Sequence, residues 1–169
     1  MAPQTAADAA AHAAIARLVA LYAKARDTTE PALYREAFAP DAMIIAGDGR
    51  VLSAGLEEIL EKVCGDQDRF TPGYRQGEIT WSVMRHQVAN LLVDVDGDRA
   101  RCEYQVATLV YDEEERRPMI MATARNEDLC ERRDGRWWII RSTLHFGWSD
   151  ERMARRLQVG PWTPPAYRR

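Results

Sequence analysis

Cysteine is scarce in this sequence, and its placement excludes the usual cysteine-based scaffolds. The 169 residues contain three cysteines, Cys64, Cys102 and Cys130, which lie far apart and form no CxxC pair. An odd number of well-separated cysteines predicts neither a disulfide framework nor a zinc site. We therefore expect no metal, and a reducing cytoplasm is the simplest location.

The sequence also lacks an excess of charge of either sign and a long apolar run. Lysine plus arginine number 23 and aspartate plus glutamate 26, so that the formal net charge is -3. This balance predicts no general attraction to nucleic acid or to an anionic membrane. The alanine-rich start, residues 1–25, lacks the basic and unbroken apolar regions of a signal peptide, and we expect no membrane-spanning helix.

Internal repeats and low-complexity linkers are missing as well, which predicts one domain for a chain of this length. Hydrophobic residues make up 46% and charged residues 29%, as in soluble globular proteins. We assign residues 1–150 to the domain. The Pro-rich remainder, 151–169, is predicted to be a tail, with a short helix over 149–158 at its start.

Helical patterns come first along the chain and strand patterns follow. Apolar residues at helical spacing predict helices over residues 6–26, 31–38 and 54–65, with a hairpin over 42–53 that turns at Gly47-Asp48-Gly49. After a loop-like stretch, alternating patterns predict strands over 78–95, 99–111, 119–133 and 136–148. This order is typical of an α+β domain, in which a curved antiparallel sheet wraps around the helices and leaves a pocket.

Alternation along the first long strand places an ionisable ring on the apolar face. Met84, His86 and Val88 share one face, while the polar Arg85 and Gln87 share the other. His86 is therefore predicted to point inward. A single inward histidine is often a core residue with hydrogen-bonded ring nitrogens, and this alternative stays open beside a catalytic base.

The same alternation gives further inward polar groups and one irregularity. Tyr104 shares its face with apolar neighbours, and Asn126 shares its face with Ala122 and Ala124. Small residues beside an asparagine predict space above the sheet. The alternatives that stay open are a packing role for Tyr104 and a place opposite a bulge for Asn126. The apolar parity flips after Asn90, which predicts a β-bulge there.

Four segments carry a resemblance to a known family: "IARLVALYAKARD", "ALYREAFAPDAMI", "MRHQVANLLVDVDGDRARCEY" and "ERRDGRWWIIRSTLHFGW". In this order they resemble the SnoaL-like branch of the nuclear-transport-factor-two-like superfamily, over residues 8–148. The resemblance implies a cone in which a curved antiparallel sheet and three helices enclose one apolar pocket. It also implies a homo-oligomer, dimer or trimer, packed through the outer sheet face that carries Arg85, Gln87 and Arg101.

Within that branch the chain resembles scytalone dehydratase, bile acid dehydratase and hexachlorocyclohexane dehydrochlorinase. The resemblance implies a catalytic pair of Asp27, at the end of the first helix, and His86, with Tyr22 as a third catalytic residue. Scytalone dehydratase has a second catalytic histidine that would fall around residues 108–110, where this chain has none. Alone, Asp27 reads equally well as a solvent-exposed helix end or as a cap for the next helix.

The predicted substrate-binding residues are Tyr104, Asn126, His145 and Trp148. The resemblance implies the role of Asn126. His145, near the end of the last strand, is a candidate for a second polar group, and exposure at the strand terminus is an equal alternative. Trp148 ends that strand where the pocket mouth is expected. Trp162, in the tail, is a candidate for a lid over the pocket.

A carboxylate that holds one ring nitrogen of a histidine leaves the other nitrogen free as a general base. We therefore expect a cofactor-free lyase or isomerase, dehydratase- or cyclase-like, acting on a hydrophobic oxygenated ring compound such as a polyketide, steroid or aromatic metabolite. The alternative is a non-catalytic small (beta) subunit of an aromatic-ring dioxygenase, or a small-molecule binding protein. Contact between Asp27 and His86 favours the enzyme, and side chains that point apart favour the alternative.

Overall fold

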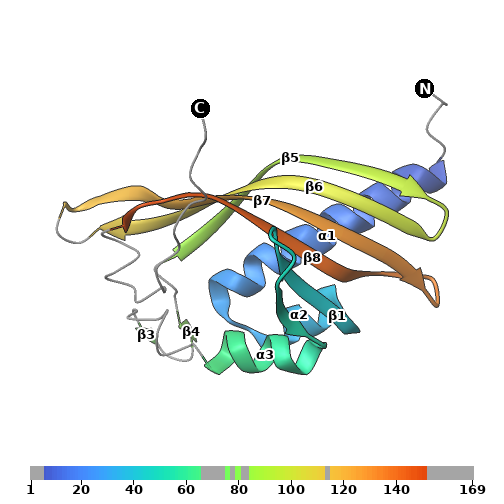
Figure 1. Cartoon of the computed structure of the whole chain (residues 1–169), viewed down its shortest axis with the longest axis horizontal. Helices are drawn as coiled ribbons and strands as arrows, with labels where there is room; N and C mark the ends of the chain where they lie inside the picture. Colours follow the sequence, from blue (N-terminus) through green and yellow to red (C-terminus); the bar gives the residue numbers. More distant parts are fainter. Residues whose placement is uncertain (1–5, 66–74, 77–78, 81–83, 113–114, 152–169) are drawn as a thin grey trace.

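A curved six-stranded sheet covers one long helix and two short ones (Figure 1). The computed structural model describes residues 6–65, 75–76, 79–80, 84–112 and 115–151. Most of the predicted short helix over 149–158, the tail with Trp162 and most of the loop-like stretch before the long strands lie outside the described residues, and Ser149, where that helix was expected to begin, is the last residue of β8. The α+β class predicted from the order of the elements is confirmed.

Helical spacing of apolar residues predicts the helices well. Their bounds are α1 (Ala6–Thr28), α2 (Pro31–Ala37) and α3 (Leu56–Gly65). In α1 the periodic residues Ile15, Leu18, Val19 and Tyr22 are all buried. Thr29 separates α1 from α2 with a positive φ of 54°, and its N–H donates to the Ala25 carbonyl at 2.7 Å, which closes the last turn.

By length and composition α1 is apolar enough to cross a membrane, contrary to the expectation from the sequence. One such helix is weak evidence, because core helices pass the same test. Alanine raises its hydropathy, and its large apolar side chains pack against β5 and β8 of the sheet.

The strand order in the main sheet is β2-β1-β8-β7-β6-β5. The bounds of these strands are β1 (Phe38–Ala46), β2 (Val51–Ala54), β5 (Met84–Asp96), β6 (Arg99–Asp112), β7 (Arg117–Arg133) and β8 (Arg136–Ser149). A separate two-stranded sheet joins β3 (Arg75–Gln76) and β4 (Ile79–Thr80).

The sheet is antiparallel, as predicted, except at one pairing, because β1 and β8 are parallel. Tight turns at Asp96-Gly97 and Asp134-Gly135 connect antiparallel neighbours, and these turns are visible in the sequence. Parallel neighbours need a long crossover instead. Here the crossover between β1 and β8 consists of the chain from β2 to β7, so no local pattern in the sequence predicts the pairing.

The bulge predicted near Asn90 is present. In the β5–β6 ladder Ala89 pairs with Gln105 and the next pair is Leu92 with Glu103, so the register shifts between them. Asn90 has a φ of 54°, a left-handed conformation that asparagine tolerates better than most residues. The bulge bends β5. Even-numbered residues point inward before it and odd-numbered residues after it.

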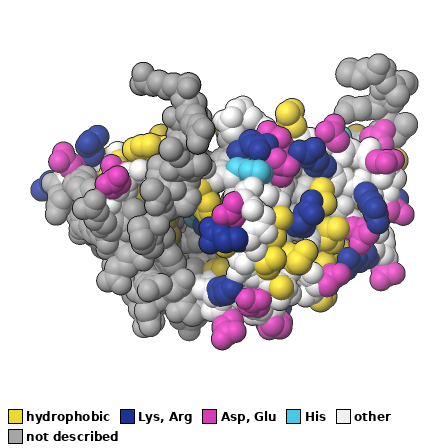
Figure 2. All heavy atoms as spheres, in the orientation of Figure 1, with side chains coloured by type: hydrophobic (Ala, Val, Ile, Leu, Met, Phe, Trp, Pro, Cys, Tyr) yellow, Lys and Arg dark blue, Asp and Glu magenta, His cyan; other side chains and the backbone are white. Residues whose placement is uncertain are grey.

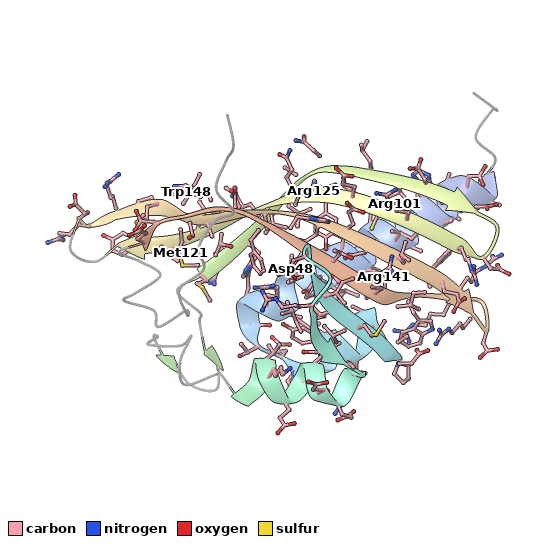
Figure 3. The ribbon with its side chains drawn as sticks, in the orientation of Figure 1. Asp48, Arg101, Met121, Arg125, Arg141 and Trp148 are labelled. Atoms are coloured by element: carbon pink, nitrogen blue, oxygen red, sulfur yellow. The ribbon has the colours of Figure 1, made fainter. Side chains whose placement is uncertain are left out.

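The inner face of the sheet and α1 enclose the core, and the outer face is charged. Arg85, Gln87 and Arg101 are exposed on the outside, as the alternation predicts. Figure 3 labels Arg101 and Arg125 along these strands, and both form ion pairs with Glu127. On the face shown in Figure 2, basic and acidic side chains alternate among apolar ones, without a large patch of one sign.

Candidate active site

The end of α1 and the start of β5 bring Asp27 and His86 into contact. The Nδ1 atom of His86 lies 2.8 Å from Oδ1 of Asp27, and the backbone N–H of His86 donates to the same oxygen at 2.8 Å. The His86 side chain is only 6% exposed and the Asp27 side chain 16%. The contact predicted from the resemblance is therefore present in the structure. Asp27 is neither a free helix end nor a cap of α2, which has Glu30 at its N-cap.

The shared oxygen determines where the histidine carries its proton. An ionised carboxylate only accepts hydrogen bonds, so the neutral imidazole must donate from Nδ1. The Nε2 nitrogen then keeps its lone pair, on a ring that lines a cavity. Burial, followed by the positive charge of Arg26, lowers the pKa of His86, and Asp27 opposes the shift. At neutral pH the ring is an uncharged base.

A mostly apolar cavity of about 180 Å³ lies between α1 and the inner face of the sheet. Five of the predicted site residues line it: Tyr22, His86, Tyr104, Asn126 and Trp148. The small side chains Ala122 and Ala124, which alternation places beside Asn126, also line the cavity and leave the space that the sequence predicts. Met121, labelled in Figure 3 near the end of the sheet, extends the apolar wall.

Tyr22 forms the helix side of this cavity. Its ring packs edge-on against Phe38, with the centroids 4.8 Å apart and an interplanar angle of 90°, and a second edge contact reaches Tyr34 at 6.2 Å. Only 3% of Tyr22 is exposed. The aromatic packing fixes the ring beside the base, one and a half turns before Asp27.

Tyr104 and Asn126 belong to a buried hydrogen-bonded chain. The Tyr104 hydroxyl donates to Oδ2 of Asp128 at 2.8 Å and accepts from the Asn126 side-chain amide at 3.3 Å. A phenol has one proton to donate, and here Asp128 receives it. Tyr104 therefore offers a ligand its ring and its oxygen lone pairs, while Asn126 retains a second amide proton and its carbonyl oxygen.

Asp128 was not among the predicted site residues. It is fully buried, and its Oδ1 has no hydrogen-bond partner among the described residues. Burial raises its pKa to about 6, while the nearby hydroxyls of Ser142 and Tyr104 oppose the shift. Alternation contained the signal, because Asp128 has the same parity as Asn126 and must also point inward.

His145 is not where the sequence analysis expects it. Leu144 is buried on the inner face, so His145 has the outer parity, and its Nε2 lies 3.2 Å from a carboxylate oxygen of Glu127. The β1–β2 hairpin covers the ring so closely that a Cβ on Gly47 would stand 2.6 Å from Nδ1. Trp148, by contrast, lines the cavity and is 53% exposed, as a residue at the mouth would be.

Thr108 and Arg26 are among the cavity residues that the sequence analysis missed. Thr108 pairs with His86 across β5 and β6 and lines the cavity. It lies in the 108–110 segment, where the second catalytic histidine of scytalone dehydratase would fall. Arg26, one residue before Asp27, lines this cavity and a second one of about 200 Å³, whose walls include His86 and Tyr22. Within the described part of the chain, no three His, Cys, Asp or Glu side chains gather as a metal site.

The chain belongs to the SnoaL-like domain family, whose pattern matches residues 7–143. No curated protein sequence matches it. Several solved structures share the fold. One is a Nostoc punctiforme protein of unknown function with a cystatin-like fold (20% identity, TM-score 0.64, 86% of this chain and 96% of that one).

Two other similar structures carry enzyme names. A provisionally named scytalone dehydratase from Novosphingobium aromaticivorans has 18% identity and a TM-score of 0.65, over 85% of this chain and 89% of that one. The type-3 hexachlorocyclohexane dehydrochlorinase LinA from Novosphingobium barchaimii has 21% identity and a TM-score of 0.64, over 83% and 89%. At these identities the likeness establishes the fold.

Proposed function

We propose that the protein is a cofactor-free lyase or isomerase, in which His86 is the general base and Asp27 orients it. The substrate is a hydrophobic, oxygenated ring compound. The observation that carries the proposal is the pair of 2.8 Å contacts from the His86 ring and backbone to one oxygen of Asp27, at the wall of an apolar cavity. A scaffold subunit or a plain carrier has no use for an oriented imidazole in such a place.

The proposed reaction begins with proton removal. Nε2 of neutral His86 takes a proton from a carbon next to a carbonyl or a leaving group, and the Nδ1–H bond to Asp27 stabilises the imidazolium that forms. In an elimination the C–H electrons form the double bond, and the imidazolium returns its proton to the departing hydroxide, which leaves as water. General base catalysis of this kind contributes about 10²–10⁴-fold.

The environment suits this base. Burial keeps the imidazole neutral at pH 7, because desolvation lowers the pKa of His86. Thr108 stands opposite His86, and the free amide proton of Asn126 is available to a developing oxyanion. Loss of one oxyanion donor typically costs roughly 3–4 kcal/mol.

Solvent hydrogen exchange tests the proposal without the natural substrate. A panel of cyclic ketones and hydroxylated ring compounds is incubated in D₂O, and mass spectrometry follows both deuterium uptake next to the carbonyl and loss of water. We expect wild-type protein to accelerate at least one of these reactions and His86→Gln and Asp27→Asn to abolish the acceleration.

His145→Gln is the matched control, because it removes a histidine that faces the outer side of the sheet. It should keep full activity. Equal activity in His86→Gln and wild type would remove the proposed mechanism, whatever the substrate.

A further inference from the structure

Arg26 is a cation in the cavity wall, and the residues that the structure describes offer it no ionic partner. It lines both cavities, and its guanidinium carbon lies 5.9 Å from the centroid of the Tyr22 ring. Among the described residues no carboxylate forms an ion pair with it, whereas surface arginines such as Arg101 and Arg133 are paired with carboxylates.

The neighbouring Asp27 does not fill this role. Residues at i and i+1 of a helix point in directions about 100° apart, so they do not face each other. The Oδ1 atom of Asp27 accepts two N–H groups from His86 instead. The charge of Asp27 is thus directed at the imidazole, and Arg26 is left with a separate direction into the cavity.

Tyrosine side chains are the main influence on Arg26, and Lys62, which also lines the second cavity, is paired with Glu58. The side chains that influence it are Tyr22, Tyr34 and Tyr104. Hydroxyl dipoles and ring faces solvate a guanidinium in part but do not neutralise it. A buried charge without an opposite charge destabilises the fold, and natural sequences keep such charges where a ligand uses them.

We propose that Arg26 binds a carboxylate of the substrate, so that the substrate class is hydrophobic ring acids with the carboxylate near the carbon that His86 deprotonates. This inference rests on the proposed function for the role of His86. A planar guanidinium matches a carboxylate with two parallel hydrogen bonds. A phosphate monoester, with nearly two charges, would need more donors than this apolar wall offers.

The proposal also explains how deprotonation next to a carboxylate becomes feasible. A carbanion or enolate that forms beside a negative group suffers like-charge repulsion. Arg26 neutralises the carboxylate before the proton moves. In the empty site burial, followed by the charge of Arg26, lowers the pKa of His86, and burial continues to do so once a carboxylate is bound.

Calorimetric titration at pH 8 tests the inference through binding alone. The probes are 2-naphthoate, 2-naphthamide and 2-naphthalenemethanol, which share a ring system and differ in charge. We expect wild-type protein to bind the carboxylate about 10- to 100-fold more tightly than the two neutral probes, the range of charge-assisted hydrogen bonds. Arg26→Gln should remove the difference, and Arg26→Lys should retain part of it.

Arg99→Gln is the control, because it removes one positive charge from a side chain that is 82% exposed. It should leave the preference unchanged. Denaturation in urea verifies that Arg26→Gln folds, and we expect it to be no less stable than wild type, since it removes a cation for which the described part of the chain provides no ion pair. Wild-type protein that fails to bind the carboxylate, or binds all three probes equally, overturns the inference, as does a preference that survives in Arg26→Gln.

Failure of the proposed function gives a different result. His86→Gln should keep the carboxylate preference while it loses hydrogen exchange. If wild-type protein prefers the carboxylate but catalyses no exchange or elimination with any ring acid, the binding role of Arg26 stands and the catalytic role of His86 falls.

Discussion

Replacement of Asp128 by asparagine should stabilise the protein at neutral and alkaline pH. The carboxyl group is fully buried beneath Tyr104, and burial raises its pKa from 3.8 to about 6. In the unfolded chain the group ionises near 3.8. Above pH 6 the folded protein must therefore hold a buried negative charge that the unfolded chain exposes to water, and this lowers the free energy of unfolding.

The size of the effect follows from linkage. The interval between 3.8 and about 6 corresponds to about 3 kcal/mol at 1.36 kcal/mol per pKa unit. The folded state binds the extra proton, so the stabilisation by this group is complete below pH 3.8 and is lost as the pH rises through 6. Asparagine keeps an oxygen to accept from Tyr104 and adds an amide that can donate toward the Ser142 hydroxyl, which lies near the Asp128 carboxyl group.

Urea denaturation of wild type and Asp128→Asn between pH 4 and pH 8 measures this difference directly. We expect the variant to be more stable by up to about 3 kcal/mol at pH 8, with the advantage shrinking toward zero at pH 4. Asp128→Glu is an unsuitable replacement because it adds volume to a packed site, whereas asparagine is nearly isosteric. An advantage that is equal at both pH values, or a variant less stable at pH 8, would refute the reasoning.

Three further predictions concern the pocket and the sheet. Tyr104→Phe should cost about 1.5–3 kcal/mol at pH 8, because it leaves the ionised Asp128 without its donor, and clearly less at pH 4, as urea curves at the two pH values would reveal. Since the folded-state pKa of His86 is lowered, His86 should contribute a loss of stability as the pH drops below 6.5, opposite in sign to the effect of Asp128. In a pH series of melting temperatures His86→Gln should therefore gain stability relative to wild type as the pH falls. Asn90→Val should cost roughly 1–2 kcal/mol in chemical denaturation, because a β-branched residue resists a φ of 54°, whereas Asn90→Gly should be tolerated.

Local periodicity predicted the parts of the fold that local forces determine. A period near 3.6 in α1 identified its buried face, and a period of two in β5 and β6 placed His86 and Tyr104 inward. The parity flip at Asn90 marked the bulge because a bulge inserts one residue, and a single inserted residue is enough to reverse the faces. The parallel pairing of β1 with β8 has no such local signature, since it joins strands separated by most of the chain.

In the site, too, some features had a signal in the local sequence pattern and others had none. The Asp27–His86 contact was expected from the resemblance, whereas spacing alone left Asp27 open as a cap or a solvent-exposed end. Alternation applied to β8 and β7 would have placed His145 outside and Asp128 inside, so these two errors were avoidable. Arg26 was not predictable in this way, because a long side chain near a helix end reaches solvent or a cavity with equal ease.

The ionisation and tautomer of His86 test the central claim most directly, because they require no substrate. Nitrogen-15 chemical shifts of the imidazole, assigned by comparison with His86→Gln and followed from pH 4 to pH 9, report which ring nitrogen carries the proton. We predict a neutral ring protonated at Nδ1 at pH 7, with an unprotonated Nε2 and a pKa below 6.5. A ring protonated at Nε2 when neutral, or a pKa above 6.5, would contradict the account of His86 as an Asp27-oriented base.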